Sequence, residues 1–252
     1  MPIVAADLVL FASANMPDTD AGAAGGAIDL LRRLDFTQPT ANDDLEVIST
    51  SASDTQSCTI EGRNAAGSIV SESKVLTGTT AAIFATLGVI ERVTKVELAS
   101  AAIGTITVRR SVAGATVRVI PATERGFLMP FRKTASATGS TVNVYAKGFW
   151  KNTHASLSLT TAKVKQNADP DARITHLLAA AVNDAATSTN RITAPAVADT
   201  QDPDTFDDTD KTVPGTDLAS LAAIGTWFRL QLPAADTPHR TTYTSELAGE
   251  SV

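Results

Sequence analysis

The nine residues Asp202–Asp210 carry five carboxylates, which are the ligand type that Ca²⁺ prefers because this hard cation binds oxygen atoms. Counted from Asp202, the spacing does not fit an EF-hand loop. Asp207 stands where the loop needs glycine, and Val213 stands where it needs the bidentate glutamate. We therefore predict a solvated acidic loop, with Ca²⁺ binding kept as the alternative.

The other residues with potential for chemistry are three histidines, His154, His176 and His239, and one cysteine, Cys58. No H-E-x-x-H or C-x-x-C spacing joins them, so buried or surface histidines are favoured over metal ligands. A single cysteine excludes an intrachain disulfide and suits a reducing cytosol. Cys58 lies in a predicted strand, where a small buried thiol is expected.

The sequence also contains no G-x-S-x-G and no P-loop, and the glycines at 22–26 do not match a dinucleotide fingerprint. We therefore expect no catalytic, cofactor-binding or metal-binding residues and no cofactor, which excludes the chain from the classes of enzyme that such motifs define. Trp150 and Trp227 lie in strand-like patterns, so core packing is predicted for both. A sugar-stacking platform is the alternative that they leave open.

The composition and net charge of the chain indicate which kinds of molecule it is not expected to bind. The net charge is −6 and the pI is near 5.1, with no cluster of lysine and arginine. This predicts no nucleic-acid partner and no anionic membrane partner. No stretch reaches 18 uncharged apolar residues, and Asp7 interrupts the apolar N-terminus, so we expect neither a membrane span nor a signal peptide. Threonine and valine are abundant and favour half-buried strands.

Alternation of apolar and polar residues predicts at least six short strands between residues 27 and 130. The clearest signal is a β-hairpin within 55–78, whose turn holds Asn64 and Gly67. Strand patterns then recur at 90–98, 104–108 and 116–120. This rhythm is typical of a β-sandwich.

A second β-rich block follows the small polar segment 133–139, which we interpret as a linker. Strands are predicted near 142–150, 157–164, 225–232 and 241–247, and a short helical turn is predicted over 217–223. The segment 173–181 fits either a strand or a helix. A long surface loop is expected over 183–214.

The resulting prediction is an all-β chain of two tandem β-sandwich domains, Ig-like or jelly-roll-like. It assigns an N-terminal strand or arm to 1–26, the first sandwich to 27–132 and the second to 140–252, with the domains meeting within 131–141. The segment Met1–Gly26 fits equally well a docking arm on a partner subunit and an ordinary first strand.

Two stretches, Thr59–Glu72 with Leu76–Thr80 and Ile90–Arg110, resemble Ig-like β-sandwich modules in structural proteins of tailed bacteriophages. Two more, Phe149–Val164 and Ala223–Ala234, together resemble the second sandwich in uncharacterised phage virion proteins. The resemblance implies a non-enzymatic virion protein that is assembled in the host cytoplasm and decorates or cements the capsid. Its partners would be other virion proteins, above all the major capsid protein. A tail, baseplate or fibre component is the first alternative, and a carbohydrate-binding module on the particle is the second.

The resemblance also implies a homo-oligomer, with a trimer favoured because capsid lattices offer local threefold positions. With only 19% charged residues, the contacts are expected to use strand edges and the N-terminal segment rather than charged pairs.

Overall fold

The computed structural model describes residues 2–35, 37–41, 43–132, 139–168, 172–201, 205–235 and 243–251. Almost all regular structure in these residues is strand, with two three-residue 3-10 turns, η1 (Ala5–Asp7) and η2 (Val197–Asp199). The all-β prediction is therefore confirmed. The finer assignment to tandem Ig-like or jelly-roll sandwiches stays a prediction.

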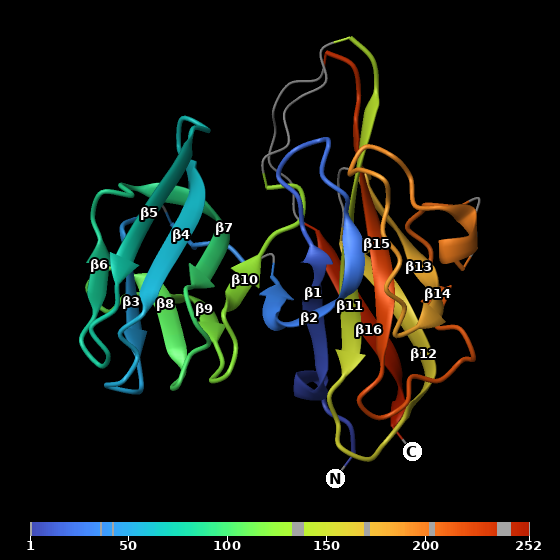
Figure 1. Ribbon diagram of the computed structural model, residues 1–252, viewed down its shortest axis with the longest axis horizontal. Coiled ribbons are helices and arrows are strands. Elements are labelled where there is room, and N and C mark those ends of the chain that lie inside the picture. The colour runs from blue at the N-terminus through green and yellow to red at the C-terminus, as the bar shows by residue number, and fades with distance from the viewer. Residues whose placement is uncertain are drawn as a thin grey trace. The chain divides into compact units, whose positions relative to one another are not determined.

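The chain divides into two compact units (Figure 1). Unit 1 combines Met1–Asp29 with Pro130–Val252, and unit 2 is the intervening segment Leu30–Met129. The strand β2 (Gly25–Leu34) begins in unit 1 and ends in unit 2. Unit 2 is thus inserted into unit 1 along the sequence.

Unit 2 contains two sheets. The first has the order β10-β7-β4-β5, with Arg32–Leu34 of β2 parallel to β10, and the second has the order β6-β3-β8-β9. The strands are β3 (Leu45–Ser49), β4 (Ser57–Asn64), β5 (Ile69–Val75), β6 (Ala82–Phe84), β7 (Ile90–Leu98), β8 (Ile106–Arg110), β9 (Thr116–Ile120) and β10 (Gly126–Leu128). The predicted hairpin is confirmed, because β4 and β5 pair antiparallel from Ser57 opposite Val75 to Arg63 opposite Ile69.

One hydrophobic core joins the two sheets of unit 2. Ile60 and Val96 enter it from the first sheet, and Val47 and Ile106 enter it from the second. Each of these side chains is fully buried. In β4 every second residue from Cys58 to Gly62 is buried, as alternation predicts, whereas in β7 the consecutive residues Val93 and Thr94 are both buried.

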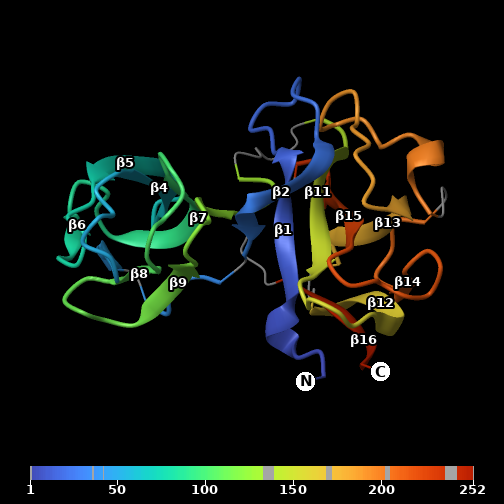
Figure 2. The same cartoon turned by 60° about the horizontal axis from the view of Figure 1, so that its bottom comes forward.

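Unit 1 contains a sheet with the order β13-β15-β11-β1 and a three-stranded sheet with the order β14-β12-β16 (Figure 2). The strands are β1 (Leu8–Asn15), β11 (Val142–Asn152), β12 (Leu159–Ala168), β13 (Ile174–Val182), β14 (Lys211–Thr212), β15 (Ala223–Leu232) and β16 (Thr244–Ser251). Leu178 and Ile224 from the first sheet pack in one core with Val164 and Leu247 from the second.

Unit 1 tests two local expectations, and two others fall largely or partly outside the described residues. The ambiguous segment 173–181 forms the strand β13. The helical turn predicted over 217–223 is wrong, because Leu218 instead makes a β-bridge with Leu159 and a turn follows. The linker predicted over 133–139 lies almost wholly outside the described residues, and so does the start of the strand predicted over 241–247.

Unit 2 nearly coincides with the first sandwich predicted over 27–132, and unit 1 groups the segment 1–26 with the residues predicted as the second sandwich. Residues Leu8–Ala12 of β1 pair antiparallel with Gly148–Asn152 of β11, so the N-terminal segment adds a strand to the sheet of unit 1. This contact joins segments that are far apart in the chain. Alternation within one strand does not identify its partner, so the insertion of unit 2 has no signature in the local sequence.

Candidate functional site

The histidines selected from the sequence lie in separate environments. His176 is fully buried on β13, whereas His154 follows β11 and its Nδ1 accepts hydrogen bonds from the backbone N–H groups of Ser156 and Leu157 at 3.2 and 3.0 Å. His239 lies outside the described residues. Within the described part of the chain, no group of three or more histidine, cysteine, aspartate or glutamate side chains is placed to hold a metal ion.

The acidic segment is described from residue 205 onward, and its carboxylates contact neighbours in unit 1. Asp207 forms an ion pair with Lys211 at 2.8 Å, and it accepts a hydrogen bond from the Thr209 hydroxyl at 2.6 Å. Burial raises the pKa of Asp207, but the bonds from Lys211 and Thr209 outweigh it and leave the pKa lowered. Asp210 lies 3.7 Å from Lys165. Asp202 and Asp204 lie outside the described residues.

Trp227 and Cys58 are core residues, as the sequence predicts. Trp227 is fully buried at the centre of β15, so a sugar-stacking role for it is not available at the surface. Trp150 is half-buried, and its Nε1 donates a hydrogen bond to the Ser245 hydroxyl at 3.2 Å. Cys58 lies in the core of unit 2, where burial raises the pKa of its thiol to about 12.

A buried ion pair between Lys147 and Asp184 was not predicted from the sequence. Lys147 is on β11, directly opposite Trp227 of β15, and its side chain is completely buried. Its Nζ contacts Asp184 Oδ2 and donates to the Ala186 carbonyl oxygen at 3.2 Å. The available signal was this lysine in the middle of the strand, between Val144-Tyr-Ala and Gly148-Phe-Trp, which carry no other charged residue.

Aromatic rings and a glycine shape the surroundings of this pair. Lys147 Nζ lies 4.9 Å from the ring centroid of Phe149 and 5.1 Å from that of Trp227. A Cβ atom at Gly225 would lie 2.7 Å from Lys147 Cε and 2.5 Å from Asp184 Oδ1, so only glycine leaves room for both side chains. Burial lowers the pKa of Lys147, and the charge of Asp184 offsets this in part. The amine is therefore easier to deprotonate than one in water.

A different feature, the strand β5, forms the open edge of the first sheet in unit 2. It is hydrogen-bonded to β4 on one side and ends the strand order on the other. Its two terminal residues, Ile69 and Val75, are 51% and 59% exposed. An edge strand of this kind presents backbone N–H and C=O groups on which another chain can add a strand.

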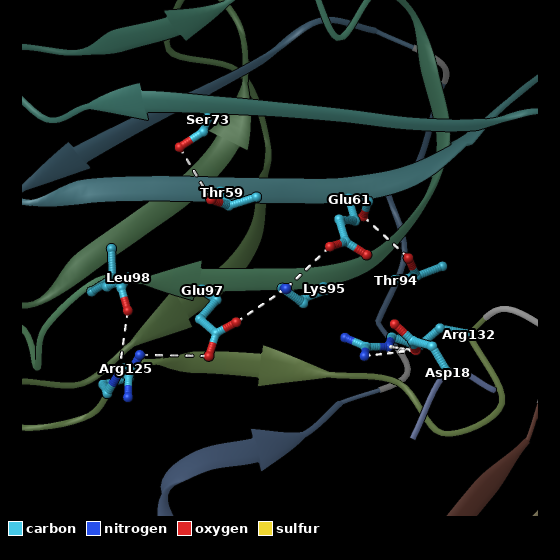
Figure 3. Close-up of polar contacts among 10 residues, drawn as sticks. All are labelled: Asp18, Thr59, Glu61, Ser73, Thr94, Lys95, Glu97, Leu98, Arg125 and Arg132. Carbon is cyan, nitrogen blue, oxygen red and sulfur yellow. Dashed lines mark hydrogen bonds and ion pairs between the residues drawn. The ribbon is translucent and has the colours of Figure 1, made fainter. Parts of the chain in front are cut away.

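The face of the same sheet carries a ladder of charged side chains (Figure 3). Lys95 Nζ lies 3.0 Å from Glu61 and 3.1 Å from Glu97, and Arg125 lies 3.6 Å from Glu97. Across β4 and β5, the Thr59 hydroxyl donates to the Ser73 hydroxyl at 3.2 Å. These charges are matched within the sheet, so the ladder leaves little net field to recruit a charged partner.

His176 is expected to make unit 1 less stable in mild acid. Burial lowers its pKa, Lys211 lowers it further, and the backbone of Val164 with the carboxylates of Asp207 and Asp210 partly opposes this. The unfolded chain therefore takes up the proton first, so stability present above about pH 6.5 is lost as the pH falls toward the folded-state pKa.

The measurement is urea unfolding of the wild type and of His176→Gln between about pH 7 and pH 5, with His154→Asn as the control histidine variant. We expect the wild type and the His154→Asn variant to lose stability over this range and His176→Gln to lose less. Equal pH dependence in all three would show that His176 does not control it.

Comparison of the chain with protein-family models, curated proteins and solved structures finds no match. Among the described residues, no helix has the length and apolar character needed to cross a bilayer. A functional proposal for this chain therefore has to come from its own residues.

Proposed function

We propose that the chain is a non-enzymatic structural protein of a bacteriophage particle, which decorates or cements the capsid through protein–protein contacts. The observation that carries the proposal is the open edge of β5, with Ile69 and Val75 exposed at its two ends. In this proposal both units are β-sandwiches, which is supported by two sheets and a shared core in each. The placement in a phage particle rests on the resemblance of the four strand-rich stretches to β-sandwich modules of phage structural proteins.

The contact is made by strand addition. Backbone hydrogen bonds along β5 provide the affinity, and the apolar side chains at its ends pack against the partner strand. The partners are the major capsid protein and further copies of this chain, with a trimer favoured at local threefold positions of the capsid lattice. Because Leu8–Ala12 pair with β11, a docking arm at the N-terminus is not part of this mechanism.

Lysines at the two ends of β5 are expected to weaken attachment strongly. The double variant Ile69→Lys/Val75→Lys places two charges on the edge, which block strand addition, whereas exposed sites change stability by only about 0.5 kcal/mol or less. Wild-type protein added to particles that lack it should bind at a copy number that matches the major capsid protein. The double variant should bind at least about tenfold less, which is about 1.4 kcal/mol of affinity.

Ile103→Lys is the matched control, because Ile103 is 63% exposed and lies outside the strands of unit 2. It should bind like the wild type. A wild-type copy number of only a few per particle would move the protein to the tail or baseplate. Undiminished binding of the double variant would rule out the β5 edge, and absence of the wild type from purified particles would overturn the proposal as a whole.

A further inference from the structure

Lys147 and Asp184 are placed for a reaction with each other. The Nζ atom contacts the carboxylate directly, and the two side chains are 0% and 12% exposed. Both belong to unit 1, one on β11 and the other in the loop after β13. We propose that the folded chain joins Lys147 Nζ to Asp184 Cγ in an intramolecular isopeptide bond. This inference is independent of the proposed function in the particle.

The reaction is a condensation that needs no co-reactant. A proton passes from the Lys147 ammonium to the Asp184 carboxylate, which gives a neutral amine and a carboxylic acid. Nζ then attacks Cγ, the C–N bond forms, and one carboxyl oxygen leaves with two protons as water. Charge and atoms balance, since an ammonium and a carboxylate become one neutral amide and one water molecule.

The two oxygens of Asp184 have different surroundings that suit this reaction. Oδ2 accepts a hydrogen bond from the backbone N–H of Ala186 at 3.1 Å, which would stabilise negative charge on that oxygen while the tetrahedral intermediate exists. Oδ1 is buried and has no hydrogen-bond partner among the described residues. It packs against Gly225, where a Cβ atom would lie 2.5 Å from it. One carboxyl oxygen of Asp184 therefore contacts the amine and a backbone N–H group, while the other is shielded from water.

Burial separates this pair from the other lysine–carboxylate pairs of the described chain. Of the lysines in these described pairs, only Lys147 is completely buried, because the lysine side chains of the other pairs are 17% exposed for Lys95 with Glu61 and Glu97, 37% for Lys165 with Asp210 and 11% for Lys211 with Asp207. Water hydrates such pairs and keeps both members charged. Lys147 is completely buried, and this loss of hydration disfavours the charged amine. The fixed contact also removes the entropy of bringing the two groups together.

Tryptic mapping of the purified full chain tests the proposal. Trypsin does not cleave after an acylated lysine, so the wild type should yield residues 134–151 joined to residues 174–191, lighter by one water than the sum of the two peptides. The variants Lys147→Arg and Asp184→Ala should yield only unlinked peptides. Lys151→Arg, a change at the other lysine near the end of β11, should keep the linked species.

The wild-type digest alone shows whether Lys147 and Asp184 are covalently joined, whether or not the variants fold. The linked peptide, sequenced by fragmentation across Lys147 and Asp184, supports the proposal. Free peptides ending at Lys147 and spanning 174–191, each at its sequence mass and with no linked species, overturn it. A linked peptide that persists in Lys147→Arg would also overturn it, because the bond would then involve another residue.

Discussion

Replacing Trp227 with alanine is expected to lower the free energy of unfolding of unit 1 by about 3–5 kcal/mol, the usual cost of deleting a large buried aromatic side chain. Trp227 is fully buried and packs with Ala24 and Tyr145. Its ring also lies so close to Gly25 that a Cβ atom there would be 2.7 Å from it. The surrounding backbone has little room to collapse into the cavity, so we expect a cost in the upper part of this range.

Urea unfolding followed by tryptophan fluorescence measures this effect in unit 1, because both tryptophans, Trp150 and Trp227, belong to it. Trp150 remains as the reporter in the variant. Val197→Ala is the surface control, since Val197 is 63% exposed and should change stability by no more than about 0.5 kcal/mol. A loss below about 1 kcal/mol in Trp227→Ala would contradict the core role that the structure gives to this residue.

The strands of this chain were predictable where alternation is regular. Cys58 and Ile60 alternate with polar neighbours, and the structure forms β4 there with both side chains in the core. The hairpin of β4 and β5 was predictable because Asn64 and Gly67 supply the turn. In these elements local conformational propensity and burial favour the same secondary structure, and this agreement allows the strands to be predicted from the sequence.

Long-range pairing was not predictable. The partner of β1 lies beyond the whole of unit 2, and the chain carries no local mark of that contact. The helical turn predicted over 217–223 was wrong because the local sequence favours a helix and the tertiary contacts do not. Asp217 is a good helix N-cap residue, but here its carboxylate accepts from the backbone N–H of Thr161 at 3.2 Å while Leu218 bridges to Leu159. Tertiary contacts override the local preference there.

The buried pair of Lys147 and Asp184 could not be predicted either, because it also depends on contacts between segments that are far apart in the sequence. A lysine in a strand ordinarily points to solvent, and an aspartate in a loop ordinarily forms a turn. Only the pairing of β11 with β15, which sets Lys147 opposite Trp227, turns the lysine toward the interior. The reaction partner then comes from the loop after β13, through a contact that no spacing in the sequence encodes.

Removing the Asp184 carboxylate is expected to cost as much stability as removing the Trp227 ring. Asp184→Ala leaves the Lys147 amine fully buried without its partner, which typically costs about 3–5 kcal/mol. Loss of a covalent link between residues 147 and 184 would lower stability by a similar amount, about 3–5 kcal/mol for a loop of this size by analogy with disulfides. Urea unfolding at neutral pH measures the loss, but this single variant does not separate the two causes.

The double variant Lys147→Met/Asp184→Ala separates them. It removes the unpaired charge and fills part of the space with an apolar side chain, so a purely ionic pair could be replaced at little cost or even with a gain in stability. A covalent pair cannot be replaced in this way, because the unfolded chain regains the entropy that the link had removed. We expect the double variant to remain about 3–5 kcal/mol below the wild type in urea unfolding. Recovery to wild-type stability would show that Lys147 and Asp184 stabilise unit 1 only as an ion pair.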